Sequence, residues 1–280
     1  MKIKLWGTRG SLPSAGPENL RYGGNTSCVE VRGEGAVLVL DAGTGIRRAG
    51  NSIPEEVSRV DIMLTHLHMD HIQGLGFFQP LYRDGLEVHI WGPPSRRLSL
   101  RARLSKYLSP PLFPVPLRDL PCELTLHDIE PATSFEIGAL SITADFVAHP
   151  GATLGYRIHE NGSTVVYLPD HEPALGAESI PSDPAWTSGY DLAKGADVLI
   201  HDAQYVTEEY GLHVGWGHST LEHTAAFAQA TEVRRLVTFH HDPSHSDTAL
   251  DTLHNSLRKS RSLPFELIAG QEGTMLQLAG

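Results

Sequence analysis

Residues 64–74 read LTHLHMDHIQG, a stretch with four metal-ligand side chains within six positions: His66, His68, Asp70 and His71. The apolar run VDIML before the histidines predicts a strand that ends near Thr65, then a tight loop and a helix that begins near His71. Imidazole nitrogen and carboxylate oxygen suit Zn²⁺ or a similar first-row ion. A single loop histidine is usually satisfied by backbone hydrogen bonds, but the H-x-H-x-D-H spacing at a strand end favours a metal site.

Three other apolar runs end on residues that could complete such a site. ITADFVAHPG delivers His149, TVVYLPDHE delivers Asp170, and LVTFHHD delivers His240 or His241. Each would be an ordinary polar residue at a strand end if taken alone. If the strands end at one edge of a sheet, these groups meet the 66–71 loop, and together they predict a two-metal site.

The histidines of LVTFHHDPSHS (236–246) have different expected roles. His240 is the first residue after the strand and is expected to reach the metal. Side chains alternate along a strand, so His241 should face away, toward residues behind the ligands or toward the substrate entrance, unless a bulge exchanges the two. His245 follows Pro243 and precedes a predicted helix, which favours a surface or capping role.

Composition restricts the class of protein. The chain has 280 residues, 40% of them hydrophobic, and we predict one domain over 1–280. Its two cysteines, Cys28 and Cys122, are typical of a reducing compartment and too few for a disulfide framework. No run resembles a signal peptide or a membrane span, so we expect a cytoplasmic protein without membrane contact. The net charge of -11 disfavours binding of long nucleic acid.

Short apolar runs bounded by Gly, Pro, Asn and Asp predict strands throughout the chain. They read CVEVRG, AVLVLDAG, VDIMLTH, LEVHIWG, LSITADFVAH, TLGYRIHE, STVVYLPD, ADVLIHD, RRLVTFHH, FELIAG and TMLQLAG. Two helices are predicted: 219–230, where Ser219 and Glu222 form a capping box, and 247–259, with leucines on one face. This order of strands and helices indicates a layered α/β domain with two packed sheets.

The segment 93–121 departs from this pattern. It has a proline-dense run and the basic residues Arg96, Arg97, Arg101, Arg103, Lys106 and Arg118, and it predicts an inserted helix followed by a stiff loop. The simpler interpretation is a solvated basic helix face; the alternative is a lid or a phosphate-collecting wall over the active site.

Several of these motifs occur in one order between residues 38 and 241: VLVLDAGTG, LTHLHMDHIQGL, AHPG, YLPD, and GWGHSTLEHTAAFA followed by LVTFHH. In this order they resemble the metallo-β-lactamase fold superfamily. The resemblance implies an α/β fold, a four-layer αββα sandwich with the site at one edge. It also implies two divalent metal ions, Zn²⁺ or else Mn²⁺ or Fe²⁺. One would be held by His66, His68 and His149, the other by Asp70, His71 and His240, with Asp170 as the bridge.

Within the superfamily, THLHMDHIQGL together with GHST before an alanine-rich helix resembles the tRNase Z and phosphoribosyl cyclic phosphodiesterase branch, whose members hydrolyse phosphodiesters. His218 matches a histidine that handles the scissile phosphate or the leaving group there. Independently, His218 precedes a predicted helix N-terminus, where free N–H groups favour an anion; a loop-packing role is the alternative. Two metals would generate hydroxide from a water for attack on phosphorus, Asp70 could orient it, and His218 could protonate the departing oxygen.

Other polar residues at strand ends are expected to support the site. Asp41 should brace its loop or accept a hydrogen bond from a ligand histidine, and Asp202, in His201-Asp202, is a candidate for the same role beside a purely structural one. His171 should point away from the site. In GTRGS (7–11), Arg9 could lie near a phosphate, but a hairpin turn is the favoured interpretation.

The resemblance has one departure that affects the substrate. The arm that grips tRNA in tRNase Z lies between the third metal motif and the bridging aspartate, and here only the residues 150–169 separate His149 from Asp170. With the net charge of -11, this favours a small phosphate ester, such as a cyclic sugar or nucleotide phosphate. The alternatives are a tRNase Z-like ribonuclease, a thioester or lactam hydrolase of the same fold, and a non-enzymatic metal-dependent sensor. A homodimer is compatible with the sequence.

Overall fold

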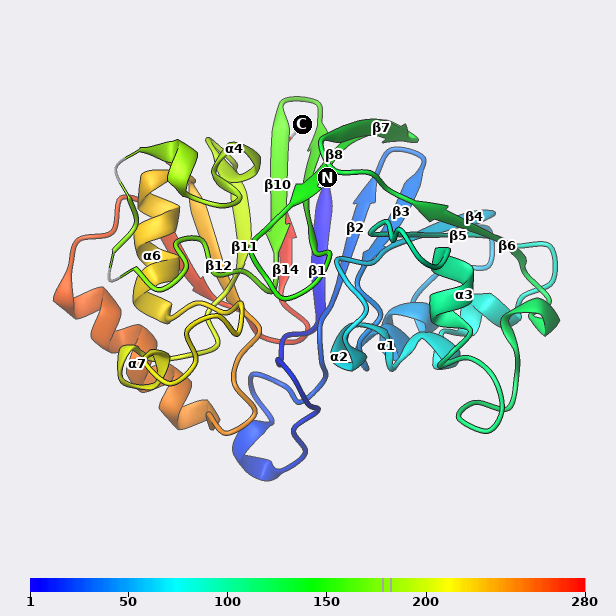
Figure 1. Ribbon diagram of the computed structural model, residues 1–280, viewed down its shortest axis with the longest axis horizontal. Coiled ribbons are helices and arrows are strands. Elements are labelled where there is room, and N and C mark those ends of the chain that lie inside the picture. Colours follow the sequence, from blue (N-terminus) through cyan, green and yellow to red (C-terminus); the bar gives the residue numbers. More distant parts are fainter. Residues whose placement is uncertain (178, 182, 280) are drawn as a thin grey trace.

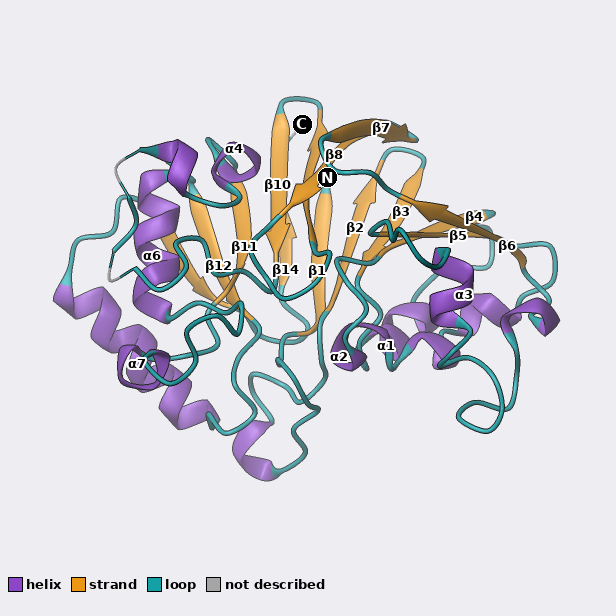
Figure 2. Ribbon diagram, viewed as in Figure 1, coloured by secondary structure: helices purple, strands orange, loops and turns teal. Residues whose placement is uncertain are grey.

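Two sheets of seven strands face each other in the computed structural model, which describes residues 1–177, 179–181 and 183–279 (Figures 1 and 2). The first sheet has the order β14-β1-β2-β3-β4-β5-β6. Its strands, in chain order, are β1 Lys2–Gly7, β2 Cys28–Gly33, β3 Ala36–Leu40, β4 Arg59–Met63, β5 Glu87–Gly92, β6 Glu123–Asp128 and β14 Met275–Gln277.

The second sheet has the order β13-β12-β11-β10-β9-β8-β7. Its strands are β7 Thr133–Ile137, β8 Leu140–Phe146, β9 Leu154–Glu160, β10 Ser163–Leu168, β11 Val198–Asp202, β12 Arg235–Phe239 and β13 Glu266–Ala269. β9 and β10 form a hairpin whose turn, Asn161-Gly162, has positive φ at both residues, as a tight two-residue hairpin requires.

Helices cover the outer face of each sheet. The α-helices are α1 Ile46–Asn51, α2 Met69–Ile72, α3 Leu100–Leu104, α4 Tyr190–Ala193, α5 Thr207–Tyr210, α6 Leu221–Ala230 and α7 Asp247–Ser260, and the short 3-10 turns are Pro17–Asn19, Leu75–Phe77, Gln79–Tyr82, Leu117–Asp119 and Pro184–Trp186. One apolar cluster fills the space between the sheets, and two others lie under α1 with α3 and under α4, α6 and α7. The molecule is therefore the predicted αββα sandwich (Figure 1).

Strand direction explains where the polar residues gather. β3 and β4 are parallel, and β10, β11 and β12 are parallel. β8 runs the same way as β10 because two antiparallel steps through β9 separate them. The carboxyl ends of these strands therefore meet at one edge of the sandwich, and the polar residues that follow them lie there.

Several local expectations need correction. The N-cap of α6 is Thr220, whose side chain accepts from His223 N–H, and not Ser219, whose hydroxyl instead donates to His171 O. GTRGS is not a hairpin turn: a long loop joins β1 to β2, and Arg9 pairs with both Thr26 and His241, so it connects the two sheets. The strands β1, β6 and β7 were not among the predicted runs.

The segment 93–121 contains the short helix α3 and, after it, turns and one 3-10 helix, which fits the predicted helix and loop. Arg103 Nη2 donates to Pro93 O at 2.6 Å and to Asp128 Oδ1 at 2.7 Å, so this arginine fastens the start of the segment to the end of β6. Within the described chain, no helix has the length and apolar character needed to cross a membrane.

Candidate metal centre

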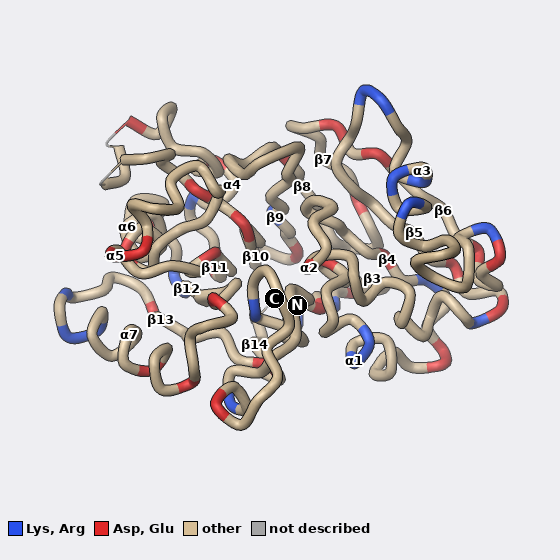
Figure 3. Tube along the Cα trace, turned by 60° about the horizontal axis from the view of Figure 1, so that its bottom comes forward, with Lys and Arg blue, Asp and Glu red and all other residues tan. Residues whose placement is uncertain are grey.

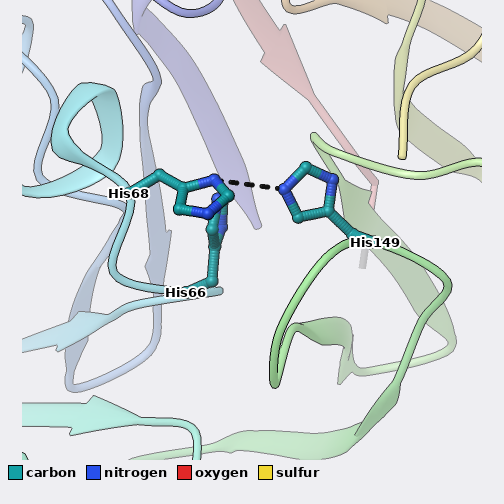
Figure 4. A group of neighbouring side chains, drawn as sticks. All are labelled: His66, His68 and His149. Atoms are coloured by element: carbon teal, nitrogen blue, oxygen red, sulfur yellow. Dashed lines mark hydrogen bonds between the residues drawn. The ribbon is translucent and has the colours of Figure 1, made fainter. Parts of the chain in front are cut away.

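Three histidines form a first donor set where the two sheets meet (Figure 4). His66 and His68 follow β4 of the first sheet, and His149 follows β8 of the second. Their ligand nitrogens lie within 4.8 Å of one another, and His149 Nε2 is 3.2 Å from His68 Nδ1. His66 is buried and His68 is exposed, so the set opens toward the surface.

A second donor set consists of Asp70, His71, Asp170 and His240, all buried. The ligand atoms again lie within 4.8 Å of one another. Asp70 Oδ2 is 3.3 Å from His71 Nε2 and 3.1 Å from His240 Nε2. As in the first set, each sheet contributes residues.

Asp170 lies between the two sets, with one oxygen toward each. Its Oδ2 is 3.7 Å from His66 Nε2 and 3.8 Å from His149 Nε2. Its Oδ1 is 3.0 Å from His71 Nε2 and 3.4 Å from His240 Nε2. A carboxylate with this placement is suited to bridge two cations.

Three buried polar atoms without a hydrogen bond indicate a binding site in this space. His66 Nε2, His71 Nε2 and Asp170 Oδ1 are buried and make no hydrogen bond within the described chain. Buried polar atoms nearly always make hydrogen bonds, so three such atoms around one space without any require an explanation. The nitrogen and oxygen donors fit a pair of divalent first-row ions, which would satisfy all three atoms.

Four of the five candidate ligand histidines have their second ring nitrogen held in place. His71 Nδ1 is 2.8 Å from Asp41 Oδ2, as expected for Asp41, and His66 Nδ1 is 3.1 Å from Thr65 Oγ1. His149 Nδ1 is 2.9 Å from Gly217 O, and His240 Nδ1 is 2.9 Å from Gln204 Oε1. Such contacts fix the ring orientation and the tautomer, which a metal site needs.

The backbone around His240 is specialised. His240 has φ 58, in the left-handed region that a non-glycine residue rarely adopts, and this turns its ring into the site at the end of β12. Its ring lies against Gly10, where an added Cβ would be 2.4 Å from His240 Nδ1. Ser11 N–H donates to Asp70 Oδ2 at 2.8 Å, so the loop after β1 positions both residues.

The protonation preferences suit metal binding at most positions. Burial would raise the pKa of Asp170, but electrostatic interactions with His240, His71 and His66 outweigh it and hold the pKa well below the usual range. Burial chiefly lowers the pKa of His66, His68 and His149, which keeps them neutral, as ligands must be. His71 differs: despite burial, Asp170 and two other carboxylates raise its pKa well above its ordinary value, so a metal would have to displace a proton there.

His218 lies beside the donor sets and is held by Asp202. Its Nδ1 is 2.6 Å from Asp202 Oδ2 and 4.0 Å from Asp170 Oδ2. Burial opposes protonation, but the charge and hydrogen bond of Asp202 raise the pKa of His218 to about 9. Its Nε2 has no hydrogen-bond partner in the described chain, which leaves that atom available to a ligand.

The remaining predicted residues lie outside the donor sets. His171 points away, as expected, with Nδ1 2.9 Å from His201 Nε2. His241 also faces away, but it is fully buried with Nε2 2.9 Å from Gly270 O, so it does not line a substrate entrance. Arg9 is fully buried, and its guanidinium donates to main-chain and Asn19 oxygens, which excludes a phosphate-binding role. His245 contacts Glu209 at 3.1 Å, and Ser246 caps α7.

Two residues near the site were not predicted. Gln204 orients His240 from two positions beyond Asp202, and only its place after a strand end could have indicated it. Glu172 is buried and accepts from the N–H groups of Gly215 and Gly217, just before His218. It follows His171 in the sequence, where no local pattern distinguishes it.

Two cavities flank the donor sets. One, of about 770 Å³, is lined by His66 and His68 and by Arg96 and Arg103 of the 93–121 segment. The other, of about 380 Å³, is lined by His218 and Ser11 and by aromatic residues of the 205–216 loop. The segment 93–121 thus lines one side of a cavity next to the site, as the interpretation of this segment as a wall requires. Figure 3 shows Lys and Arg gathered around α3.

Comparison with known proteins agrees with this geometry. A family model described as Beta-lactamase superfamily domain matches residues 37–241. The chain is 25% identical to Ribonuclease Z of Crocosphaera subtropica, over 94% of this chain and 93% of that protein. It is 26% identical to Ribonuclease Z of Gemmatimonas aurantiaca, over 99% of this chain and 96% of that protein.

Solved structures share the fold. The short form of human tRNase Z superposes with a TM-score of 0.70 at 21% identity, covering 100% of both chains. A diphosphatase from the PhnP family superposes with a TM-score of 0.67 at 17% identity, covering 98% of this chain and 96% of that one. A Zn²⁺-bound PqqB from Methylobacterium extorquens has a TM-score of 0.70 at 17% identity, covering 99% of this chain and 100% of that one.

Proposed function

This chain belongs to the metallo-β-lactamase superfamily and is a metal-dependent hydrolase of that fold, and we propose that it hydrolyses phosphodiesters. The observation that carries the proposal is the Asp202-held His218 beside two donor sets that share Asp170. An acid next to a dinuclear site is what cleavage of a poor leaving group from phosphorus requires.

In this proposal the two donor sets supply the metal ligands. His66, His68 and His149 would hold one divalent ion, and Asp70, His71 and His240 the other, with Asp170 shared. When bound, the ions supply Lewis-acid chemistry: they neutralise charge on the phosphoryl oxygens and make a water more acidic. Zn²⁺ fits these nitrogen and oxygen donors, as do Mn²⁺ and Fe²⁺.

The chain's own residues orient the attacking water and protonate the leaving oxygen. Asp70, fixed by the N–H of Ser11, lies where it can accept a hydrogen bond from the attacking water. As the water oxygen bonds to phosphorus and gives up a proton to solvent, the bond from phosphorus to the leaving oxygen breaks. His218 Nε2 donates a proton to that oxygen while Asp202 stabilises the ring orientation.

Two kinds of phosphodiester are candidate substrates: RNA and a small phosphate ester. The curated relatives are named Ribonuclease Z, and their names support the alternative of RNA cleavage more directly than a small cyclic phosphate. The tight β9–β10 hairpin, which fills the chain between His149 and Asp170, and the net charge of -11 favour a small phosphodiester. The large cavity bearing Arg96 suits an anionic substrate of either kind.

The central test is the His68→Ala variant, which removes a first-set nitrogen. We expect turnover of bis(p-nitrophenyl) phosphate to be lost and the metal content, measured by plasma mass spectrometry, to fall from two ions to about one per chain. His159→Ala is the control, because that histidine is exposed on β9. Full activity of the His68 variant would contradict the proposal.

A substrate screen separates the alternatives. The metal-loaded protein would be assayed side by side on cyclic nucleotides, cyclic sugar phosphates, short RNA, a thioester and a β-lactam. Preference for the thioester or lactam would refute phosphodiesterase activity. Bound metal without hydrolysis of any ester would indicate a metal-dependent sensor instead.

A further inference from the structure

Trp216 is an exposed tryptophan on a firmly held loop beside His218. Its side chain is 59% exposed, although large aromatic side chains are usually mostly buried. His213 packs edge-on against it with ring centroids 4.8 Å apart, and Tyr205 stacks on His213 at 4.4 Å. These three rings form an aromatic step at the rim of the 380 Å³ cavity that His218 also lines.

Buried contacts hold this tryptophan at the surface. Glu172, 2% exposed, accepts from the N–H groups of Gly215 and Gly217, the residues on either side of Trp216, and from the Tyr210 hydroxyl. Both glycines have positive φ, at 84 and 85 degrees, which other residues rarely adopt. A backbone fixed in this way holds Trp216 at the rim of the cavity.

The charges of this cavity differ from those of the larger one. Apart from His218, its charged side chains are Glu209 and Asp242, and within the described chain no lysine or arginine lines it. Both carboxylates already accept hydrogen bonds, Glu209 from His245 and the N–H of Val206, and Asp242 from Ser244. The side of this cavity that bears Glu209 and Asp242 therefore repels phosphate and suits an uncharged, planar part of a substrate, whereas the cavity that Arg96 lines suits its anionic part.

We propose that Trp216 stacks against the base of a nucleoside leaving group, so that the substrate is a phosphodiester with a nucleoside on the His218 side. The inference rests on the proposed function, because His218 as the acid places the leaving group on its own side of the metals. It selects nucleotide substrates over sugar phosphates that lack a base. Bases stack on aromatic side chains without regard to their identity, so little preference among the four bases is expected.

The test compares two matched substrates in steady-state kinetics. One is diadenosine monophosphate, and the other is the same diester without the base on the leaving nucleoside. Trp216→Ala should raise KM for the first roughly tenfold, with little change in kcat, and leave KM for the second unchanged. Trp216→Phe keeps a stacking ring, so its KM for the first diester should stay close to that of the unaltered protein. This result would also show that the loop tolerates substitution at this position.

Leu212→Ala is the control, since that side chain is 84% exposed on the same loop and does not line the cavity. Equal effects of Trp216→Ala on both substrates, or none on either, would overturn the inference while leaving phosphodiesterase activity standing. If the unaltered protein cleaves neither these diesters nor bis(p-nitrophenyl) phosphate, the proposed function fails instead. Quenching of tryptophan fluorescence by adenosine then decides the inference: it should be strong in the unaltered protein and weak in Trp216→Phe, and equal quenching would refute it.

Discussion

His218 combines a charged partner, Asp202, with a free Nε2 beside the metal donor sets. A residue that only binds metal and a residue that protonates a leaving group differ in what their removal does. Loss of a ligand removes an ion, whereas loss of an acid matters only when the leaving group is a poor one. The two roles can therefore be separated by the choice of substrate.

We predict that His218→Ala lowers kcat by about 100-fold or more on a diester with an alkyl leaving group, the usual range for loss of general acid catalysis. On bis(p-nitrophenyl) phosphate, whose leaving group departs without a proton, the loss should be much smaller. The metal content should stay at two ions. Equal losses on both substrates, or loss of an ion, would exclude the role as an acid.

At the scale of single residues, the sequence predicted which side chains gather at the site but not the backbone geometry and contacts that orient them. The spacing of His66 to His71 indicated a donor cluster, and alternation predicted that His240 and His241 face opposite ways, as they do in the structure. The physical cause is different, however: His240 has left-handed backbone geometry rather than the conformation of a continuing strand. Gln204 and Glu172 act through contacts across the fold, which no local pattern records.

At the scale of elements, the buried strands were predictable because their apolar runs are continuous. β6 and β7 were missed because they alternate exposed and half-buried residues at the end of their sheets. β1 was missed because its two lysines interrupt the apolar pattern. The cap of α6 shifted by one residue because the Ser219 hydroxyl donates to His171 O in a neighbouring loop, a tertiary contact that overrides local propensity.

The 93–121 segment yields a prediction for one of its arginines. Arg96 is exposed at the large cavity and forms no ion pair in the described part of the chain, whereas Arg103 is committed to Pro93 O and Asp128. Arg96→Ala should raise KM for an anionic diester about tenfold, because a hydrogen bond to a charged group contributes roughly 1.5 kcal/mol.

The adjacent Arg97 provides a matched control, since it is equally basic and exposed but does not line the cavity. Arg97→Ala should leave KM nearly unchanged in the same assay at low ionic strength. Identical effects of the two substitutions would mean that the segment attracts substrate only through its overall charge, as a solvated basic face would.

At the scale of the whole molecule, the site depends on both sheets, since each donor set takes residues from both. Binding of an ion to either set therefore stabilises the docked sandwich relative to the unfolded chain. Several of the buried histidines outside these sets also affect stability. Burial lowers the pKa of His171, His201, His241 and His254, and that of His201 falls to about 4.

This predicts acid sensitivity in the metal-free protein. His201 has a folded pKa below its unfolded value near 6.5, so the unfolded chain takes up a proton first as the pH falls. The stability that the neutral ring confers is complete above pH about 6.5 and is lost as the pH falls toward about 4, by at most roughly 3 kcal/mol for this residue. Urea unfolding in a chelator, where metal release does not contribute, should show a steeper loss over this interval in the unaltered protein than in His201→Asn. Substitution of the exposed His159 by Asn should leave the slope as it is, and an unchanged slope in His201→Asn would show that this buried histidine does not set the acid limit.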